Sequence, residues 1–211
     1  MINRVIETMT QRLADTDKKG ALHSDIFIQA GTAHSAHYED GRIEELASSN
    51  ADGSGARIIV GDRTFYSHSP GTSPSAISRI LSEAESSAFG TLPDPPGNDR
   101  GPVLTMEEKM LPPDISYMKE LDLKIRKGSK YVRQAAFRYN ISKRNVLIIR
   151  SDGRCAEDSR TYCSFSAMVI AEKDGILQTA SERRSMAIPH KDFWSGSDPE
   201  DVAFAALERA L

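Results

Sequence analysis

The segment Asp40-Gly41-Arg42 returns as Asp152-Gly153-Arg154, and 152 − 40 = 112 residues separate the two copies. Asp-Gly is typical of a tight β-hairpin, because a type I′ turn needs positive φ at both central residues. Each copy has the same predicted surroundings: an amphipathic helix, several strands, and a helix that opens with a capping residue and a proline. A repeat of this length indicates one folding unit used twice.

Hydrophobic periodicity gives the elements around the two turns. The stripe that predicts a first helix, ending near Gly20, is Ile2, Val5, Ile6, Met9 and Leu13. Ser73-Pro74 and Asp198-Pro199 each predict a helix start, since the first residue can cap the helix and the first turn does not need the N–H that proline lacks. A further helix is predicted over 114–127, and the predicted strands include 24–31, 55–60, 63–68, 131–139, 145–149 and 162–171. Gly61-Asp62 and Asp174-Gly175 indicate further hairpins.

These elements predict an α+β fold made of duplicated units, each a helix, about four antiparallel strands and a helix, with helices packed on sheets. We expect a first unit over residues 1–90, a linker over 91–105 and a second unit over 106–211. The linker is predicted because 90–102 is rich in proline and glycine. The last helix runs into the C-terminal Leu211 without a cap, so we expect a further domain beyond this chain.

Composition indicates an ordinary globular protein without membrane spans. The net charge is −3 and aromatic residues make up 7%. No apolar stretch approaches the ~20 residues that span a bilayer, and the N-terminus lacks the pattern of a signal peptide. Cys155 and Cys163 are too few for a disulfide framework, which indicates a reducing compartment.

Residues 119–150 carry 10 basic and 2 acidic side chains, a local charge of 10 − 2 = +8. Such a stretch can attract phosphates, but it has no interleaved aromatic platform on which bases could stack and no recognisable nucleic-acid module. We interpret it as a solvated helix face and charged strand edges, and expect no nucleic-acid partner.

No set of residues in this chain predicts a catalytic, metal or cofactor site. His34 and His37 resemble a ligand pair, but side chains three apart on a strand point to opposite faces. The histidines and serines lack the strand–turn–helix elbow of a catalytic triad. Both cysteines are interpreted as small buried hydrophobic residues. We therefore assign no catalytic, cofactor-binding or metal-binding residue.

Two further segments suggest sites but have simpler interpretations. Gly53-Ser54-Gly55 superficially resembles a phosphate loop, but it precedes a strand instead of a helix, so we interpret it as flexible backbone leading into a hairpin. Phe193 and Trp194 lie in a Gly/Ser-rich segment. They could form a contact surface, but we favour the interpretation that they anchor the segment to the core.

Tyr-Glu-Asp-Gly-Arg-Ile-Glu-Glu (38–45) and Gly-Ser-Gly-Ala-Arg-Ile-Ile-Val (53–60) resemble the N-terminal region of TldD/PmbA proteins, a family also labelled modulator of DNA gyrase. The resemblance continues through 63–69, 150–153, 156–160, 169–172 and 198–211. The order and spacing of these segments carry it, since each alone is degenerate. Pro112-Pro113 and Phe193-Trp194 depart from the family pattern.

The resemblance implies a cytoplasmic zinc metallopeptidase that acts on unfolded or small peptides and is built as a dimer, either a homo-oligomer or paired TldD/PmbA-type subunits. The family's active subunit carries His-Glu-x-x-x-His and a cysteine ligand in its C-terminal half. This sequence contains no His-Glu pair, so no zinc or catalytic residue carries over, and zinc is implied only for the missing C-terminal domain.

We therefore expect a non-catalytic N-terminal region that walls a chamber, supports a dimer and admits extended peptide, inactive as a peptidase by itself. The alternative is a free-standing binding or scaffold protein that lacks the peptidase half. Nucleic-acid binding through 119–150 is a third hypothesis, and it predicts affinity that falls steeply with salt.

Overall fold

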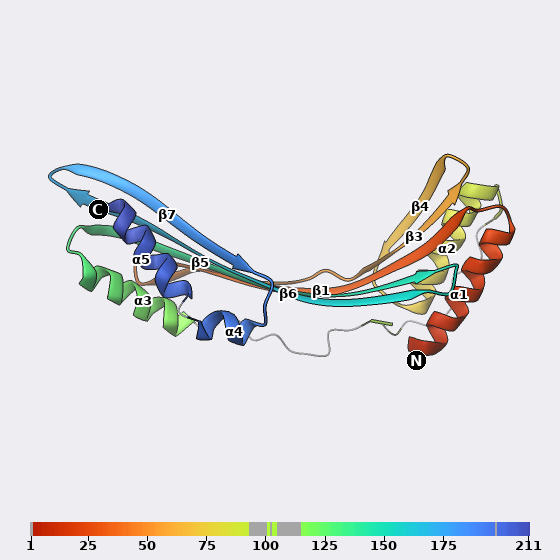
Figure 1. Ribbon diagram of the computed structural model, residues 1–211, viewed down its shortest axis with the longest axis horizontal. Coiled ribbons are helices and arrows are strands. Elements are labelled where there is room, and N and C mark those ends of the chain that lie inside the picture. The colour runs from red at the N-terminus through yellow and green to blue at the C-terminus, as the bar shows by residue number, and fades with distance from the viewer. Residues whose placement is uncertain (1, 93–100, 102, 105–114, 197) are drawn as a thin grey trace. The chain divides into compact units, whose positions relative to one another are not determined.

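The structure is a computed structural model that describes residues 2–92, 101, 103–104, 115–196 and 198–211. Within these residues it has five helices and seven strands (Figure 1). The elements are α1 (Ile2–Lys18), β1 (His23–Glu39), β2 (Arg42–Asn50), β3 (Gly53–Val60), β4 (Arg63–Pro70), α2 (Pro74–Phe89), α3 (Ile115–Gly128), β5 (Val132–Arg150), β6 (Cys155–Lys173), β7 (Ile176–Met186), α4 (His190–Ser195) and α5 (Asp198–Ala210).

The strands form one antiparallel sheet, which confirms the predicted α+β class. Their order is β4-β3-β1-β5-β6-β7, and β2 pairs with β1 beside this path. The Asp40 N–H donates to the Ala135 carbonyl and the Ser151 N–H to the Ser24 carbonyl, both at 3.1 Å. Both bonds join β1 or the residue that follows it to β5 or the residue that follows it, as expected of an antiparallel pair.

The chain divides into two compact units, and three long strands contribute several residues to both. Unit 1 comprises Met1–Gly31, Asn50–Lys109 and Arg144–Ser159, and unit 2 comprises Thr32–Ser49, Met110–Lys143 and Arg160–Leu211. Because β1, β5 and β6 are long enough to enter both units, neither unit is one continuous piece of sequence. This division differs from the consecutive units predicted over 1–90 and 106–211, and most of the predicted linker, 91–105, lies outside the described residues.

Unit 1 packs α1 and α2 against alternate residues of the sheet. Ile26 lies directly opposite Ala56 in the β1–β3 register, and both side chains are buried. Directly opposed residues point to the same face, so the strands turn one apolar row toward the helices. Leu13 of α1 and Ile80 of α2 cover this row and are also fully buried. The predicted stripe of α1 is confirmed at Val5, Met9 and Leu13.

Unit 2 packs α3, α4 and α5 against the other ends of the long strands. Its core is aromatic: the rings of Phe137 and Phe165 stack with centroids 5.9 Å apart, and Tyr38 continues the stack at 6.0 Å from Phe137. Alternate residues of β6 from Cys163 to Ala171 join this core. The opposite face of the same strands carries polar and half-buried residues and has no described helix on it.

The described residues of the second half of the chain form three strands, where about four were predicted. Predicted strands 131–139 and 145–149 are parts of β5, which continues through Asn140 and Ser142. The polar run between the two apolar stretches indicated a break. It is instead part of one long strand, whose residues up to Lys143 belong to unit 2 and whose residues from Arg144 belong to unit 1.

The predicted type I′ turns at Asp40-Gly41 and Asp174-Gly175 and one predicted cap are confirmed, whereas at Asp152-Gly153 only the glycine has positive φ. Asp40 and Gly41 have φ of 45° and 86°, and Asp174 and Gly175 have 54° and 78°, as type I′ turns require. The Ser73 Oγ accepts a hydrogen bond of 3.2 Å from the Ala76 N–H at the start of α2. The Asp198 side chain lies outside the described part of the structure, although α5 does begin at this residue. None of the described helices is both long and apolar enough to span a membrane.

Candidate functional site

The histidines singled out by sequence lie on one strand and do not converge. His34 and His37 are both on β1, and the Nε2 of His37 lies 3.6 Å from Oε2 of Glu39. Among the described residues, no group of three or more His, Cys, Asp or Glu is placed to hold a metal ion.

The two cysteines have different environments. Cys163 is buried, its Sγ donates to the Ile188 carbonyl at 3.7 Å, and burial raises the pKa of its thiol. Cys155 is exposed, so the prediction of a buried residue was wrong there. It begins β6, in a run from Cys155 to Arg160 where every residue is exposed, so alternation could not place it in a core.

The Gly53-Ser54-Gly55 segment is strand and not loop. It forms the start of β3, with Gly55 opposite Phe27 on one side and His68 on the other. A Cβ added at Gly55 would overlap the hydroxyl of Tyr66, whose ring covers the glycine. The second glycine is thus needed for close packing of an aromatic ring and not for chain flexibility or phosphate binding.

This part of unit 1 forms a hollow of about 450 Å³ on the sheet face opposite α2. The Tyr66 and His68 rings stack beside it with centroids 5.8 Å apart, and Tyr66 is 62% exposed. It has an apolar wall but no described cation or buried polar group that points to a ligand.

Phe193 and Trp194 anchor α4 to the core of unit 2, as predicted. Phe193 is fully buried, and the ring centroid of Trp194 lies 4.6 Å from that of Tyr139 and 4.9 Å from that of Tyr117. The indole N–H of Trp194 donates to His190 Nε2 at 2.8 Å. Burial lowers the pKa of His190, so this ring is neutral near pH 7 and can accept the bond.

The basic stretch 119–150 is partly neutralised by carboxylates. Lys124 pairs with Glu200 at 2.6 Å, and Arg133 pairs with Glu172 at 2.9 Å, in both cases with an acidic residue outside the stretch. Arg126 bonds Asp122 at 2.7 Å and also contacts Asp40. The +8 of the sequence therefore does not form one uncompensated patch.

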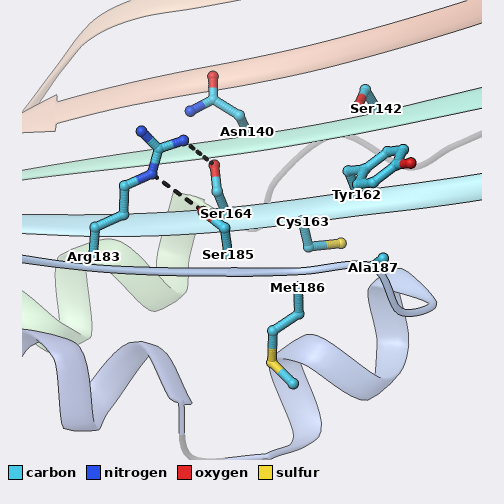
Figure 2. A pocket seen from close by; sticks show the side chains of 9 residues that line it. All are labelled: Asn140, Ser142, Tyr162, Cys163, Ser164, Arg183, Ser185, Met186 and Ala187. Atoms are coloured by element: carbon cyan, nitrogen blue, oxygen red, sulfur yellow. Dashed lines mark hydrogen bonds between the residues drawn. The ribbon is translucent and has the colours of Figure 1, made fainter.

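A larger hollow, about 540 Å³, lies on the open face of unit 2 where β5, β6 and β7 run side by side (Figure 2). It is lined by Asn140, Ser142, Tyr162, Cys163, Ser164, Arg183, Ser185, Met186 and Ala187. Arg183 is the charged member of this set. Its Nε–H donates to Ser185 Oγ at 3.2 Å and its Nη2–H to Ser164 Oγ at 3.5 Å, so two neighbouring strands hold the guanidinium (Figure 2).

A smaller hollow of about 150 Å³ adjoins the first, because Asn140 and Ser142 line both. It extends the polar surface over β1 and β2 through His34, Ser35 and Ser49. The open face of unit 2 is thus crossed by a groove of small hydroxyl and amide side chains, with an arginine near the β7 edge.

Strand β7 ends the sheet, so its outer edge has no strand partner within the described residues. Its first half, 176–181, has no charged side chain, and Ile176 and Leu177 are 64% and 63% exposed. An uncovered edge with apolar side chains and few charges is a template for pairing with another extended chain.

Comparison with known proteins gives the family. The family model for the PmbA/TldA metallopeptidase central domain matches residues 104–211, and that for PmbA/TldA metallopeptidase domain 1 matches 24–88. The chain belongs to the PmbA/TldD family. Among curated proteins, none matches this sequence.

Solved structures share the fold of this PmbA/TldD-family chain. TldE from Thermococcus kodakarensis superposes with a TM-score of 0.67 at 15% identity, over 96% of this chain and 47% of its own. A proposed modulator of a DNA gyrase from Thermotoga maritima gives 0.68 at 16% identity, over 97% and 47%. A similar protein from Bacteroides thetaiotaomicron gives 0.60 at 15% identity, over 97% and 49%. The chain spans about half the length of these structures.

Sequence reasoning missed the open-face residues of this PmbA/TldD-family chain. Ser164 and Ser185 lie opposite each other in the β6–β7 register, and Arg183 lies opposite Ser166. Their spacing by two is visible in the sequence and predicts a shared face on each strand. Only the register between the two strands brings them together.

Proposed function

We propose that this chain is the non-catalytic N-terminal region of a TldD/PmbA-type zinc metallopeptidase that acts on unfolded or small peptides in the cytoplasm. In this proposal the region walls a chamber, supports a dimer and admits extended peptide. The observation that carries it is the match of the family's domain 1 and central domain, in that order, over a chain about half as long as its structural relatives.

The residues that the structure describes do not fit a zinc site. The sequence has no His-Glu pair, and the described residues bring together no three potential ligands. Zinc in a peptidase polarises the scissile carbonyl and activates water, which needs such a ligand set. We therefore place zinc and bond cleavage outside these two domains and derive no chemical step from residues of this chain.

The edge of β7 is the element best suited to receive an extended peptide. Backbone pairing gives affinity with little dependence on sequence, as a peptidase for unfolded chains requires. The other edges are less suited: β2 carries Arg42, Glu44 and Glu45, and β4 is only 8 residues long and ends at Pro70. Charges and proline are the devices that discourage strand addition.

The test measures, by fluorescence anisotropy, the affinity of the chain for a labelled unstructured peptide. The affinity for the same peptide N-methylated at alternate amides is compared with it, because N-methylation prevents strand pairing. N-methylation removes backbone donors and leaves the side chains and net charge unchanged. A lost hydrogen bond is worth about 0.5–1.5 kcal/mol, so methylating several of the peptide amides that face β7 should weaken binding by about 10-fold or more.

On the protein side, Thr179→Pro and Ala180→Pro form a matched pair. Adjacent residues of an edge strand alternate in facing the neighbouring strand or open solvent, so one proline interrupts the β6 ladder and the other blocks the open edge. The variant that keeps wild-type stability should lose peptide binding. Equal affinity for both peptides, with that variant binding normally, would refute strand addition at β7.

The same samples test the enzymatic part of the proposal. The chain alone should leave the peptide intact by mass spectrometry, with or without added zinc. Zinc-dependent cleavage by the purified chain would contradict the assignment of catalysis to another region. Sedimentation measurements test the dimer, since a chain that stays monomeric at all concentrations would not support one.

A further inference from the structure

We propose that Arg183, Ser164 and Ser185 form a carboxylate-binding site that takes the C-terminal carboxylate of the bound peptide. This inference rests on the proposed function for the identity of the ligand, and on the geometry of the open face for the chemistry of the site. The three side chains come from two adjacent strands of unit 2 and meet in the hollow of about 540 Å³.

The Arg183 guanidinium has no carboxylate partner within the part of the chain that the structure describes, where it donates to Ser185 Oγ and Ser164 Oγ. Other arginines of unit 2 are paired with acids: Arg133 lies 2.9 Å from Glu172, and Arg184 lies 4.0 Å from Asp201. An arginine fork matches the geometry of a carboxylate and binds it through parallel N–H donors. Arg183 keeps such donors unused.

The serine hydroxyls strengthen this preference for an anion. Each accepts a hydrogen bond from Arg183, and among the described residues neither hydroxyl donates one to a protein acceptor. A hydroxyl that accepts from a cation still has its own O–H to donate, and the cation polarises that bond. The cluster therefore presents unused donors, and no lining residue of the hollow is acidic.

The position of the cluster relative to the β7 edge fits the end of a peptide. Arg183 follows the uncharged segment 176–181 by two residues, at the same edge strand. A peptide paired along 176–181 with its carboxylate at Arg183 would run parallel to β7. The Tyr162 ring, 42% exposed and lining the same hollow, offers a surface for the last side chain of the peptide.

The test compares one fluorescent peptide carrying a free C-terminal carboxylate with its C-terminal amide, at equal ionic strength. Charge-assisted hydrogen bonds should make the free acid bind wild-type protein about 10-fold more tightly than the amide. Arg183→Gln should reduce binding of the acid to the level of the amide. Arg184→Gln is the matched control, because it removes the same charge from the opposite face of β7 and should preserve the preference.

A second measurement does not depend on peptide binding. Acetate, compared with sodium chloride at the same concentration, should shift the NMR signals of the Arg183 Nε–H and of the Ser164 and Ser185 amides in wild-type protein. In Arg183→Gln, acetate should leave the signals of the two serine amides unchanged. Inorganic phosphate is the competing ligand. Displacement of the peptide acid by phosphate more strongly than by acetate at equal charge would identify a phosphate site and overturn the proposal.

The outcomes separate this inference from the proposed function. Peptide binding that is equal for acid and amide overturns the carboxylate site and leaves strand addition standing. Acetate shifts at Arg183 without any peptide binding overturn the proposed function together with the peptide as the ligand of this site. If acetate causes no NMR shifts and the peptide acid binds no more tightly than the amide, with correctly folded protein, the site itself is overturned.

Discussion

Replacing Phe193 with alanine should destabilise unit 2 by about 4 kcal/mol, within the range for a buried Phe→Ala change. Phe193 is fully buried, and its ring centroid lies 5.9 Å from Tyr139 and 6.3 Å from Trp194. Tyr139 is held on β5 within the paired sheet, so the surroundings have little freedom to close the cavity. The change therefore removes both the buried surface and the aromatic contacts that hold α4.

Urea denaturation followed by tryptophan fluorescence measures this effect directly, because the chain contains 1 tryptophan, Trp194, in contact with the altered position. Leu177→Ala, at a side chain 63% exposed, is the control and should change stability by less than about 0.5 kcal/mol. Hydrogen exchange should rise in unit 2 and stay unchanged in α2 of unit 1. A loss below about 1 kcal/mol for Phe193→Ala would refute the anchor.

Three further changes test other parts of the structure. The Tyr38 hydroxyl donates to Asp122 Oδ2 at 3.3 Å, and burial with the nearby Asp122 charge raises the pKa of Tyr38 from 10.0 to about 12. The fold favours the neutral hydroxyl, so the contribution of Tyr38 to stability is complete below pH 10 and is lost as the pH rises through about 12. The stability difference between wild type and Tyr38→Phe, measured by denaturation at each pH, should therefore shrink over that window. Gly175→Ala should cost about 1–2 kcal/mol because Gly175 has φ 78°, whereas Asp174→Asn should be nearly neutral since asparagine tolerates the φ of 54° there; equal melting temperatures for the two variants would contradict this. Iodoacetamide should label exposed Cys155 in the native protein and buried Cys163 only after unfolding, as peptide mapping can show, and native labelling at Cys163 would disprove its burial.

Local signals in the sequence predicted the turns and helix ends well. Asp40-Gly41, Asp174-Gly175 and Ser73-Pro74 act through their own backbone geometry and their nearest neighbours, so a short window of sequence contains the needed information. The stripe of α1 is equally local, because helical spacing alone defines its buried face.

Features that depend on pairing between distant segments were not predictable in the same way. The continuity of β5 through Asn140 and Ser142 is set by its neighbours in the sheet, which compensate for a polar run that by itself indicates a break. The sequence predicted two units but not that each is made of separate segments, because this follows from strands long enough to serve two cores. The contact of Arg183 with Ser164 requires the β6–β7 register, which composition does not encode.

The position of Gly55 shows the same limit at a single residue. Glycines at 53 and 55 suggested a mobile loop, yet Gly55 is a strand residue that accommodates the ring of Tyr66 from the next strand. A glycine chosen for close approach and one chosen for flexibility look alike in sequence, and only the neighbouring strand distinguishes them.

Hydrogen exchange of the 211-residue chain with a saturating unstructured peptide tests the central claim most directly. If this region admits extended peptide at its open edge, outward-facing amides of 176–181 in β7 should become protected, and the N-methylated peptide should protect them far less. Protection confined to another surface, or equal protection by both peptides, would contradict the account.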